Sequence, residues 1–179
     1  MSKRCTRFVR RKQDAYDTPE SAVLPLIPHL EFGTMFCEPC AGAMKLALTL
    51  ETHGMSCVVA YDIEPRHANV IKANALETFW PGSADLIITN PPWTRSLLHP
   101  MIDTFRVFRP TWLLFDADWA HTRQAAPFLR YCRKIVSVGR VSWMENGISG
   151  FDNCAWYLFD RDPAATEFVG RAAEREIAA

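Results

Sequence analysis

An apolar run at residues 85–89 leads directly into Asn90-Pro91-Pro92-Trp93, and this junction limits the possible folds more than any other feature. A run without alternating polar residues is typical of a strand that is buried on both faces. Two successive prolines end such a strand, because neither has an N–H to donate. The junction therefore predicts a sheet covered by helices on both sides, with the Asn-Pro-Pro turn at the carboxyl end of one strand.

Apolar runs and amphipathic stretches alternate along the rest of the chain, and turn residues separate them. We expect strands at residues 34–37, 56–61, 85–89, 111–115, 135–143 and 154–159. We expect helices at residues 42–53, 65–75, 100–108 and 118–130, after a short helical or irregular segment at 24–30. This alternation predicts an α/β fold with a mostly parallel sheet, helices on both faces and an antiparallel C-terminal hairpin.

Charge is distributed unevenly along the 179 residues. Six of the 20 basic residues precede the first acidic residue, which leaves 14 basic against 20 acidic residues in the remainder. A basic arm on an acidic body suits a nucleic-acid partner, although a solubilising terminus explains the charge equally well. We expect the basic arm at residues 1–13, one domain at 14–160 and a C-terminal tail or helix at 161–179.

Composition also suggests where the protein works. No apolar run approaches the ~20 residues that span a bilayer, and no apolar segment follows the N-terminal charges as in a secretory signal. We therefore expect a cytoplasmic protein without membrane contact. The six cysteines lack the spacing of a disulfide scaffold, and Cys37 and Cys40 have no second ligand pair nearby, so we expect reduced thiols and no metal.

Two expected strands end in carboxylates suited to a ligand. Glu38 stands in Glu-Pro-Cys-Ala-Gly, where it can pair with a ligand ammonium or simply favour the start of the next helix. Asp62 follows about 20 residues later, where it can accept two ribose hydroxyls or simply cap a turn. Only Gly42 of a dinucleotide fingerprint is present, which disfavours NAD. Together these residues predict a pocket for a nucleoside that carries an amino acid.

The Asn-Pro-Pro-Trp turn suits an exocyclic amine. The Asn90 side-chain oxygen and the carbonyls of the turn can accept both amine hydrogens, which leaves the nitrogen lone pair for an incoming methyl group. Trp93 can stack on the ring that carries the amine. The alternative is that these residues form only a turn.

The chain resembles the class I S-adenosylmethionine-dependent amino-methyltransferases, whose mark is Asn/Asp-Pro-Pro-aromatic after the fourth strand. Tyr16-Asp17-Thr18-Pro19 resembles the N-terminal Tyr-x-Thr-Pro segment of that family. Its place before the other motifs matches the gamma order of DNA N6-adenine methyltransferases, including small phage and prophage forms. The resemblance covers about residues 14–160. It implies a Rossmann-like methyltransferase fold, S-adenosyl-L-methionine as cofactor, and methylation of the N6 amine of adenine in DNA.

The resemblance also assigns roles to residues. It implies that Thr18 and Pro19 border the cofactor carboxylate, Glu38 its amino group and Asp62 its ribose. The implied cofactor site comprises Tyr16, Thr18, Pro19, Glu38, Pro39, Cys40, Gly42, Asp62, Ile63, Asn74 and Asn90, with Glu77 as the alternative to Asn74 at the adenine amine. The implied catalytic residues are Asn90, Pro91, Pro92 and Trp93, and the substrate contacts are Trp93, Trp143, Phe151, Arg10 and Arg11.

Three alternatives stay open. The same turn serves methyltransferases of RNA adenine or guanine amines and of protein glutamine, although the glutamine enzymes resemble one another in carrying Tyr at the fourth position. A catalytically silent nucleic-acid-binding subunit is the alternative of another class. The basic arm and the motif order favour nucleic acid, and DNA over RNA. Sequence specificity would come from residues 145–153, from a homodimer or from a partner protein.

Overall fold

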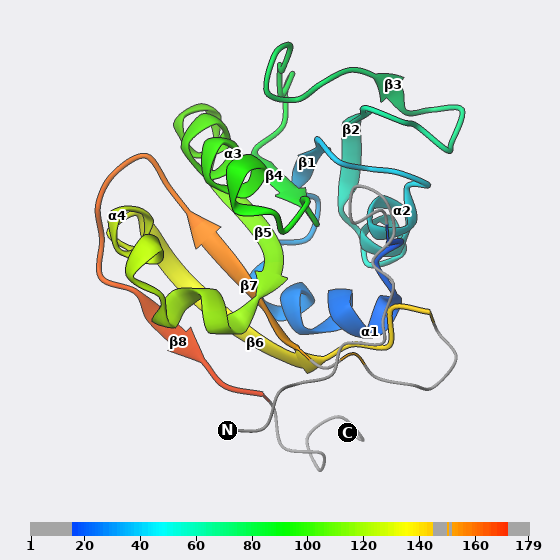
Figure 1. Cartoon of the computed structure of the whole chain (residues 1–179). Coiled ribbons are helices and arrows are strands. Elements are labelled where there is room, and N and C mark those ends of the chain that lie inside the picture. The colour runs from blue at the N-terminus through cyan, green and yellow to red at the C-terminus, as the bar shows by residue number, and fades with distance from the viewer. Residues whose placement is uncertain (1–15, 145–149, 151, 172–179) are drawn as a thin grey trace.

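The computed structural model describes residues 16–144, 150 and 152–171. Its strands form one eight-stranded sheet in the order β3-β2-β1-β4-β5-β7-β6-β8 (Figure 1). The strands are β1 Met35–Glu38, β2 Ser56–Asp62, β3 Ile71–Lys72, β4 Leu86–Thr89, β5 Thr111–Asp116, β6 Cys132–Arg140, β7 Asn153–Phe159 and β8 Glu167–Val169. The α-helices are α1 Glu20–Val23, α2 Lys45–Thr52, α3 Arg95–Phe108 and α4 Ala126–Leu129, and the 3-10 helices are η2 Leu24–His29, η3 Ala117–His121 and η4 Arg123–Ala125.

The sheet is mostly parallel, as predicted. β3, β2, β1, β4 and β5 pair in parallel along one half of the sheet. β7 enters antiparallel between β5 and β6, so that β6 and β7 form the predicted C-terminal hairpin. The strand order reverses between β1 and β4, because the chain returns from the edge strand β3 to the other side of β1, and parallel α/β sheets bind ligands outside the strand ends at such a point.

Successive residues of the central strands enter two separate hydrophobic cores. Ile88 of β4 and Trp112 of β5 pack with α1, η2 and α2 in one core. Ile87 and Leu113, their neighbours in sequence, pack with α3 and the η3 region in the other. This alternation follows from the period of two of a strand, and it explains why these strands are apolar throughout. The predicted helices on both faces are therefore present (Figure 1).

A single tryptophan fastens the N-terminal segment to the sheet. Trp156 of β7 is fully buried, and its indole Nε1 donates a hydrogen bond of 2.8 Å to the carbonyl oxygen of Ala22 in α1. The two residues are 134 positions apart in the sequence. The contact holds α1, and with it the residues immediately before α1, against the sheet. No helix in the described part of the chain is long and apolar enough to cross a membrane.

The predicted helix at residues 65–75 is wrong. The chain there turns several times and adds the short edge strand β3 beside β2. Two backbone N–H groups that this helix would use are bound elsewhere: His67 Nδ1 accepts from Asn69, and the Asp62 carbonyl accepts from Ala73. Such local bonds compete with helix formation, and the β-branched Ile71 suits the edge strand better.

Three further boundaries differ from prediction. The helix expected at 118–130 is divided into η3, η4 and α4, because Thr122 is extended and its Oγ1 donates to the carbonyl of Trp119. α3 begins at Arg95 rather than at Pro100, which lies inside the helix. Part of the segment expected as a tail or helix forms β8, which pairs in parallel with β6, so this expectation is wrong for Glu167–Val169. Residues 172–179 lie outside the described residues.

Candidate functional site

A cavity of about 680 Å³ lies at the carboxyl ends of β1, β2 and β4. This volume is in the range of pockets that hold cofactors and drug-sized ligands. Ten of the eleven residues implied for the cofactor site line the cavity, and Pro19 is the exception: Tyr16, Thr18, Glu38, Pro39, Cys40, Gly42, Asp62, Ile63, Asn74 and Asn90. The structure therefore brings together residues from five separate parts of the sequence.

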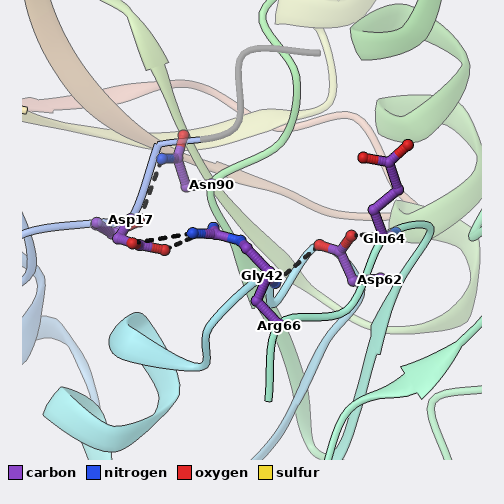
Figure 2. A network of polar contacts seen from close by, with 7 residues as sticks. Asp17, Gly42, Asp62, Glu64, Arg66 and Asn90 are labelled. Atoms are coloured by element: carbon purple, nitrogen blue, oxygen red, sulfur yellow. Dashed lines mark hydrogen bonds and ion pairs between the residues drawn. The ribbon is translucent and has the colours of Figure 1, made fainter. Parts of the chain in front are cut away.

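Asp62 organises the loop that follows β1. Its Oδ2 accepts a hydrogen bond of 2.8 Å from the Gly42 N–H, and its Oδ1 accepts one of 2.8 Å from the Glu64 N–H (Figure 2). A carboxylate has about four lone-pair sites, so each oxygen keeps the capacity to accept a ligand hydroxyl. Asp62 therefore caps the turn and also keeps the acceptor capacity that the predicted ribose contact requires.

Glu38 lies at the end of β1 and is 2% exposed. Its Oε2 accepts a hydrogen bond of 3.1 Å from the Ala47 N–H in the first turn of α2, so it acts as the helix-start carboxylate that was its alternative role. Burial raises the pKa of Glu38 well above its ordinary value, and the nearby Asp62 carboxylate raises it further, whereas the bond from Ala47 lowers it. An ammonium group in the cavity would favour the charged form.

Asn90 follows β4 and is held by two side chains. Its Nδ2 donates to Thr18 Oγ1 at 3.2 Å, and its Oδ1 accepts from the Trp93 indole Nε1 at 3.2 Å. Thr18 is buried, and it belongs to the segment that Trp156 fastens to the sheet. The two bonds fix which end of the carboxamide presents its oxygen, and that oxygen is the group required to accept an amine.

Aromatic side chains gather beside Asn90. The Trp93 and Trp143 ring centroids are 5.6 Å apart at an interplanar angle of 79°, and those of Tyr16 and Trp143 are 6.2 Å apart at 48°. Trp143 was implied as a substrate contact, and the structure places it against Trp93 in the Asn-Pro-Pro-Trp turn. Pro91 is buried, whereas Pro92 lines the cavity. Arg10, Arg11 and Phe151 lie outside the described residues.

The far end of the cavity contains Asn74. Its Nδ2 donates to Glu77 Oε1 at 2.8 Å, and its Oδ1 accepts from the Leu76 N–H at 3.1 Å. Asn74 therefore organises the turn that borders the cavity, and Glu77 contacts Asn74 rather than standing in its place among the cavity-lining residues. Ile63, at the end of β2, is 49% exposed in this open cavity, as a residue flanking a ligand ring would be.

The cysteines do not form a reactive pair. Burial raises the pKa of Cys40 to about 12, and the carboxylate of Asp62 contributes in the same direction, so Cys40 lines the cavity as a neutral thiol. Burial also raises the pKa of Cys37. Across residues 16–144, 150 and 152–171, no group of three or more His, Cys, Asp or Glu side chains is placed to hold a metal ion.

Sequence reasoning missed the ion pair between Asp17 and Arg66, both of which line the cavity. Arg66 Nη2 lies 2.6 Å from Asp17 Oδ1, and Nη1 lies 3.1 Å from Oδ2. The residues are 49 positions apart, and only the folded sheet brings them together. The same reasoning missed Lys45, Lys72 and Met101, which also line the cavity.

Several solved methyltransferases share this architecture. A protein described as an RNA methyltransferase from Pyrococcus horikoshii matches with a TM-score of 0.61 at 13% identity, over 82% of this chain and 86% of that one. A dimethyladenosine transferase from Plasmodium falciparum matches with a TM-score of 0.55 at 17% identity, over 80% of this chain and 62% of that one. A protein described as the modification subunit of a type I restriction enzyme from Vibrio vulnificus matches with a TM-score of 0.55 at 13% identity, over 89% of this chain and 48% of that one.

No protein-family model and no curated protein match the sequence. The likeness to these three solved structures, at identities of 13–17%, therefore concerns the fold alone. It establishes a Rossmann-like methyltransferase fold, as predicted.

Proposed function

We propose that the protein transfers a methyl group from S-adenosylmethionine to the exocyclic N6 amine of adenine in DNA. One observation carries the proposal: Asn90, suited to hold an amine, lines the same cavity as Asp62, suited to hold a ribose. A binding module for a nucleoside would need Asp62 but would have no use for an oriented amide at the other end of the cavity. The Rossmann-like methyltransferase fold supports this reading.

The cavity residues fit the cofactor. Asp62 has acceptor capacity for two hydroxyls, Ile63 offers an apolar surface to a ring, and Glu38 offers a carboxylate to an ammonium. Thr18 would border the carboxylate, and Asn74 would approach the adenine, whereas Pro19 does not line the cavity. When bound, S-adenosylmethionine supplies an electrophilic methyl group on a sulfonium.

The protein contributes orientation rather than acid–base chemistry. Asn90 Oδ1 already accepts one hydrogen bond from Trp93 and has a second lone pair for an amine hydrogen. The turn carbonyls accept the other amine hydrogen, since Pro91 and Pro92 present no N–H that could compete for them. The nitrogen lone pair would then face the methyl group, and transfer would break the sulfur–methyl bond, leave S-adenosylhomocysteine and release one amine proton to solvent. Correct positioning is a large part of such catalysis. The rings of Trp93 and Trp143 would stack with the target base.

DNA is the first candidate substrate because of the motif order and the basic arm, including Arg10 and Arg11. RNA adenine is the second, because two of the proteins of similar fold are described as acting on RNA or as a dimethyladenosine transferase. Both substrates present an exocyclic amine on a planar ring, and an unpaired base costs less to expose than a paired one. Protein glutamine and a silent binding role are further outcomes for the same assay.

Tritiated S-adenosylmethionine incubated separately with duplex DNA, single-stranded DNA, RNA and cell protein tests the proposal. Digestion and nucleoside chromatography identify the labelled product, and N6-methyldeoxyadenosine is expected. Asn90→Ala should lower transfer by at least about 100-fold, as loss of a positioned acceptor does, while cofactor binding is largely kept. Asn69→Ala is the matched control, because Asn69 is exposed and does not line the cavity.

The possible outcomes separate the candidates. Label in RNA or glutamine keeps the chemistry and changes the substrate. Cofactor binding without transfer to any pool supports the silent subunit instead. Equal loss of transfer and cofactor binding in Asn90→Ala contradicts the role given to Asn90, because its proposed contact is with the substrate amine.

A further inference from the structure

The guanidinium of Arg66 lies between the part of the cavity that Asp62 lines and the part that Asn90 lines. The Arg66 backbone N–H donates to the Gly42 carbonyl at 2.9 Å, and Gly42 in turn donates to Asp62. On its other side the guanidinium binds Asp17, the neighbour of Thr18, which contacts Asn90 (Figure 2). The contacts thus run from the proposed ribose site to the proposed amine site, with one cation in the middle.

Gly42 leaves the space that the guanidinium occupies. Its φ is +50°, a conformation that other residues rarely adopt, and a Cβ on Gly42 would lie 2.7 Å from Arg66 Nη2. A side chain at position 42 would therefore have to displace the end of the Arg66 side chain.

Stability does not explain the ion pair. The Arg66 and Asp17 side chains are 41% and 36% exposed, and pairs at this exposure contribute only about 0–1 kcal/mol. A guanidinium has five N–H donors, and the two bonds to Asp17 use two of them. It can therefore hold Asp17 and donate hydrogen bonds to a second carboxylate, in the planar two-bond geometry that arginine favours.

We propose that Arg66 is the cation that binds the amino-acid carboxylate of the cofactor, with Asp17 holding the guanidinium in place. This inference rests on the proposed function, which puts a nucleoside carrying an amino acid in the cavity. The cofactor sulfur carries the methyl group and the amino-acid chain as separate branches, and Asp17 places the guanidinium beside Thr18, the residue proposed to border the carboxylate at the end of that chain. Selectivity for the intact cofactor over its truncated nucleoside then depends on Arg66.

Two other cations line the cavity. Lys72 lies on β3, where its Cα partner is Asp62, and so belongs to the nucleoside end. Lys45 begins α2, just after the Gly42 turn, and is the nearer rival. Arg66 is connected through Asp17 to the segment that contains Thr18, and this connection favours Arg66 as the carboxylate ligand.

Calorimetric titration with two ligands tests the inference. S-adenosylhomocysteine contains the amino acid, and 5′-methylthioadenosine has the same thioether nucleoside without it. Arg66→Gln should weaken S-adenosylhomocysteine binding by about 10- to 100-fold, the effect of losing a charged hydrogen-bonded pair, and change 5′-methylthioadenosine binding by less than about 3-fold. Arg123→Gln, which removes the same charge from an exposed site that does not line the cavity, should change both affinities by less than about 3-fold, and Lys45→Gln tests the nearer rival. Thermal unfolding checks that each variant is folded.

The outcomes distinguish this inference from the function on which it rests. If the unmodified protein binds neither ligand, the proposed cofactor site is wrong and this inference is overturned with it. If the protein binds both ligands and Arg66→Gln weakens them equally, or weakens neither, the function stands and the role of Arg66 is wrong. A selective loss in Lys45→Gln instead of Arg66→Gln assigns the carboxylate to Lys45.

Discussion

Replacing Trp156 by Phe tests how the fold supports the site. Trp156 is fully buried, and its indole donates at 2.8 Å to Ala22, four residues after Thr18. Phe keeps an aromatic ring but loses this donor, which leaves a buried carbonyl with one partner fewer and costs about 1–3 kcal/mol. The smaller ring leaves a void of roughly 40 Å³, which adds about 1 kcal/mol at ~24 cal/mol per Å³. We therefore expect a loss of about 2–4 kcal/mol in the free energy of unfolding.

Urea unfolding followed by far-ultraviolet circular dichroism measures this loss. With a slope of about 2 kcal/mol per M, the midpoint should fall by about 1–2 M. Trp80→Phe is the matched control, because Trp80 is 64% exposed, and it should change stability by less than about 0.5 kcal/mol. The variant at Trp156 should also bind S-adenosylhomocysteine more weakly while still folded, since the segment that contains Thr18 is less firmly held. Similar small losses for both tryptophans would refute the reasoning.

Two further predictions concern Glu38 and Gly42, which line the cavity. Burial raises the pKa of Glu38, so its contribution to stability is present at acid pH and is lost as pH rises through the raised pKa. Glu38→Gln should therefore have a higher melting temperature than the unmodified protein at pH 8 but not at pH 4. A difference that shrinks with rising pH contradicts this sign. Gly42→Ala should cost about 1–2 kcal/mol for its positive φ and also weaken S-adenosylhomocysteine binding, because the new Cβ displaces Arg66. Gly33→Ala, whose φ is +84° with open space around the new Cβ, should show the stability loss in chemical unfolding without the binding loss.

The strands and the main site motifs could be predicted from the sequence because they depend on neighbouring residues. A run such as Leu86–Thr89 is apolar throughout because alternate side chains enter different cores. The residues at the ends of β1, β2 and β4 then meet by topology, since parallel strands place their carboxyl ends at one edge. A similar local bond starts η3, where Asp116 Oδ1 accepts from the Asp118 N–H.

The helix expected at 65–75 and the pair of Asp17 with Arg66 could not be predicted in the same way. The helix fails because the His67 side chain binds the Asn69 N–H nearby and Ala73 pairs with β2 through the Asp62 carbonyl, and periodicity does not register such bonds. The ion pair joins residues 49 positions apart, and neither belongs to a motif that signals a partner. Its only trace in the sequence is Gly42, whose missing Cβ leaves room for the guanidinium.

The segment before α1 decides whether the site is complete. Asn90 alone could rotate its carboxamide, and then oxygen and nitrogen would exchange places before an incoming amine. The Trp93 indole N–H, which can only donate, prevents this by binding Oδ1; Thr18 accepts from Nδ2 and supports the same orientation, and Trp156 holds the Thr18 segment through Ala22. Asp17, beside Thr18, positions Arg66 at the other half of the cavity. One short segment therefore orients both the amine acceptor and the proposed carboxylate site, so a change that loosens it should impair cofactor binding and methyl transfer together, whereas Asn90→Ala should impair transfer alone.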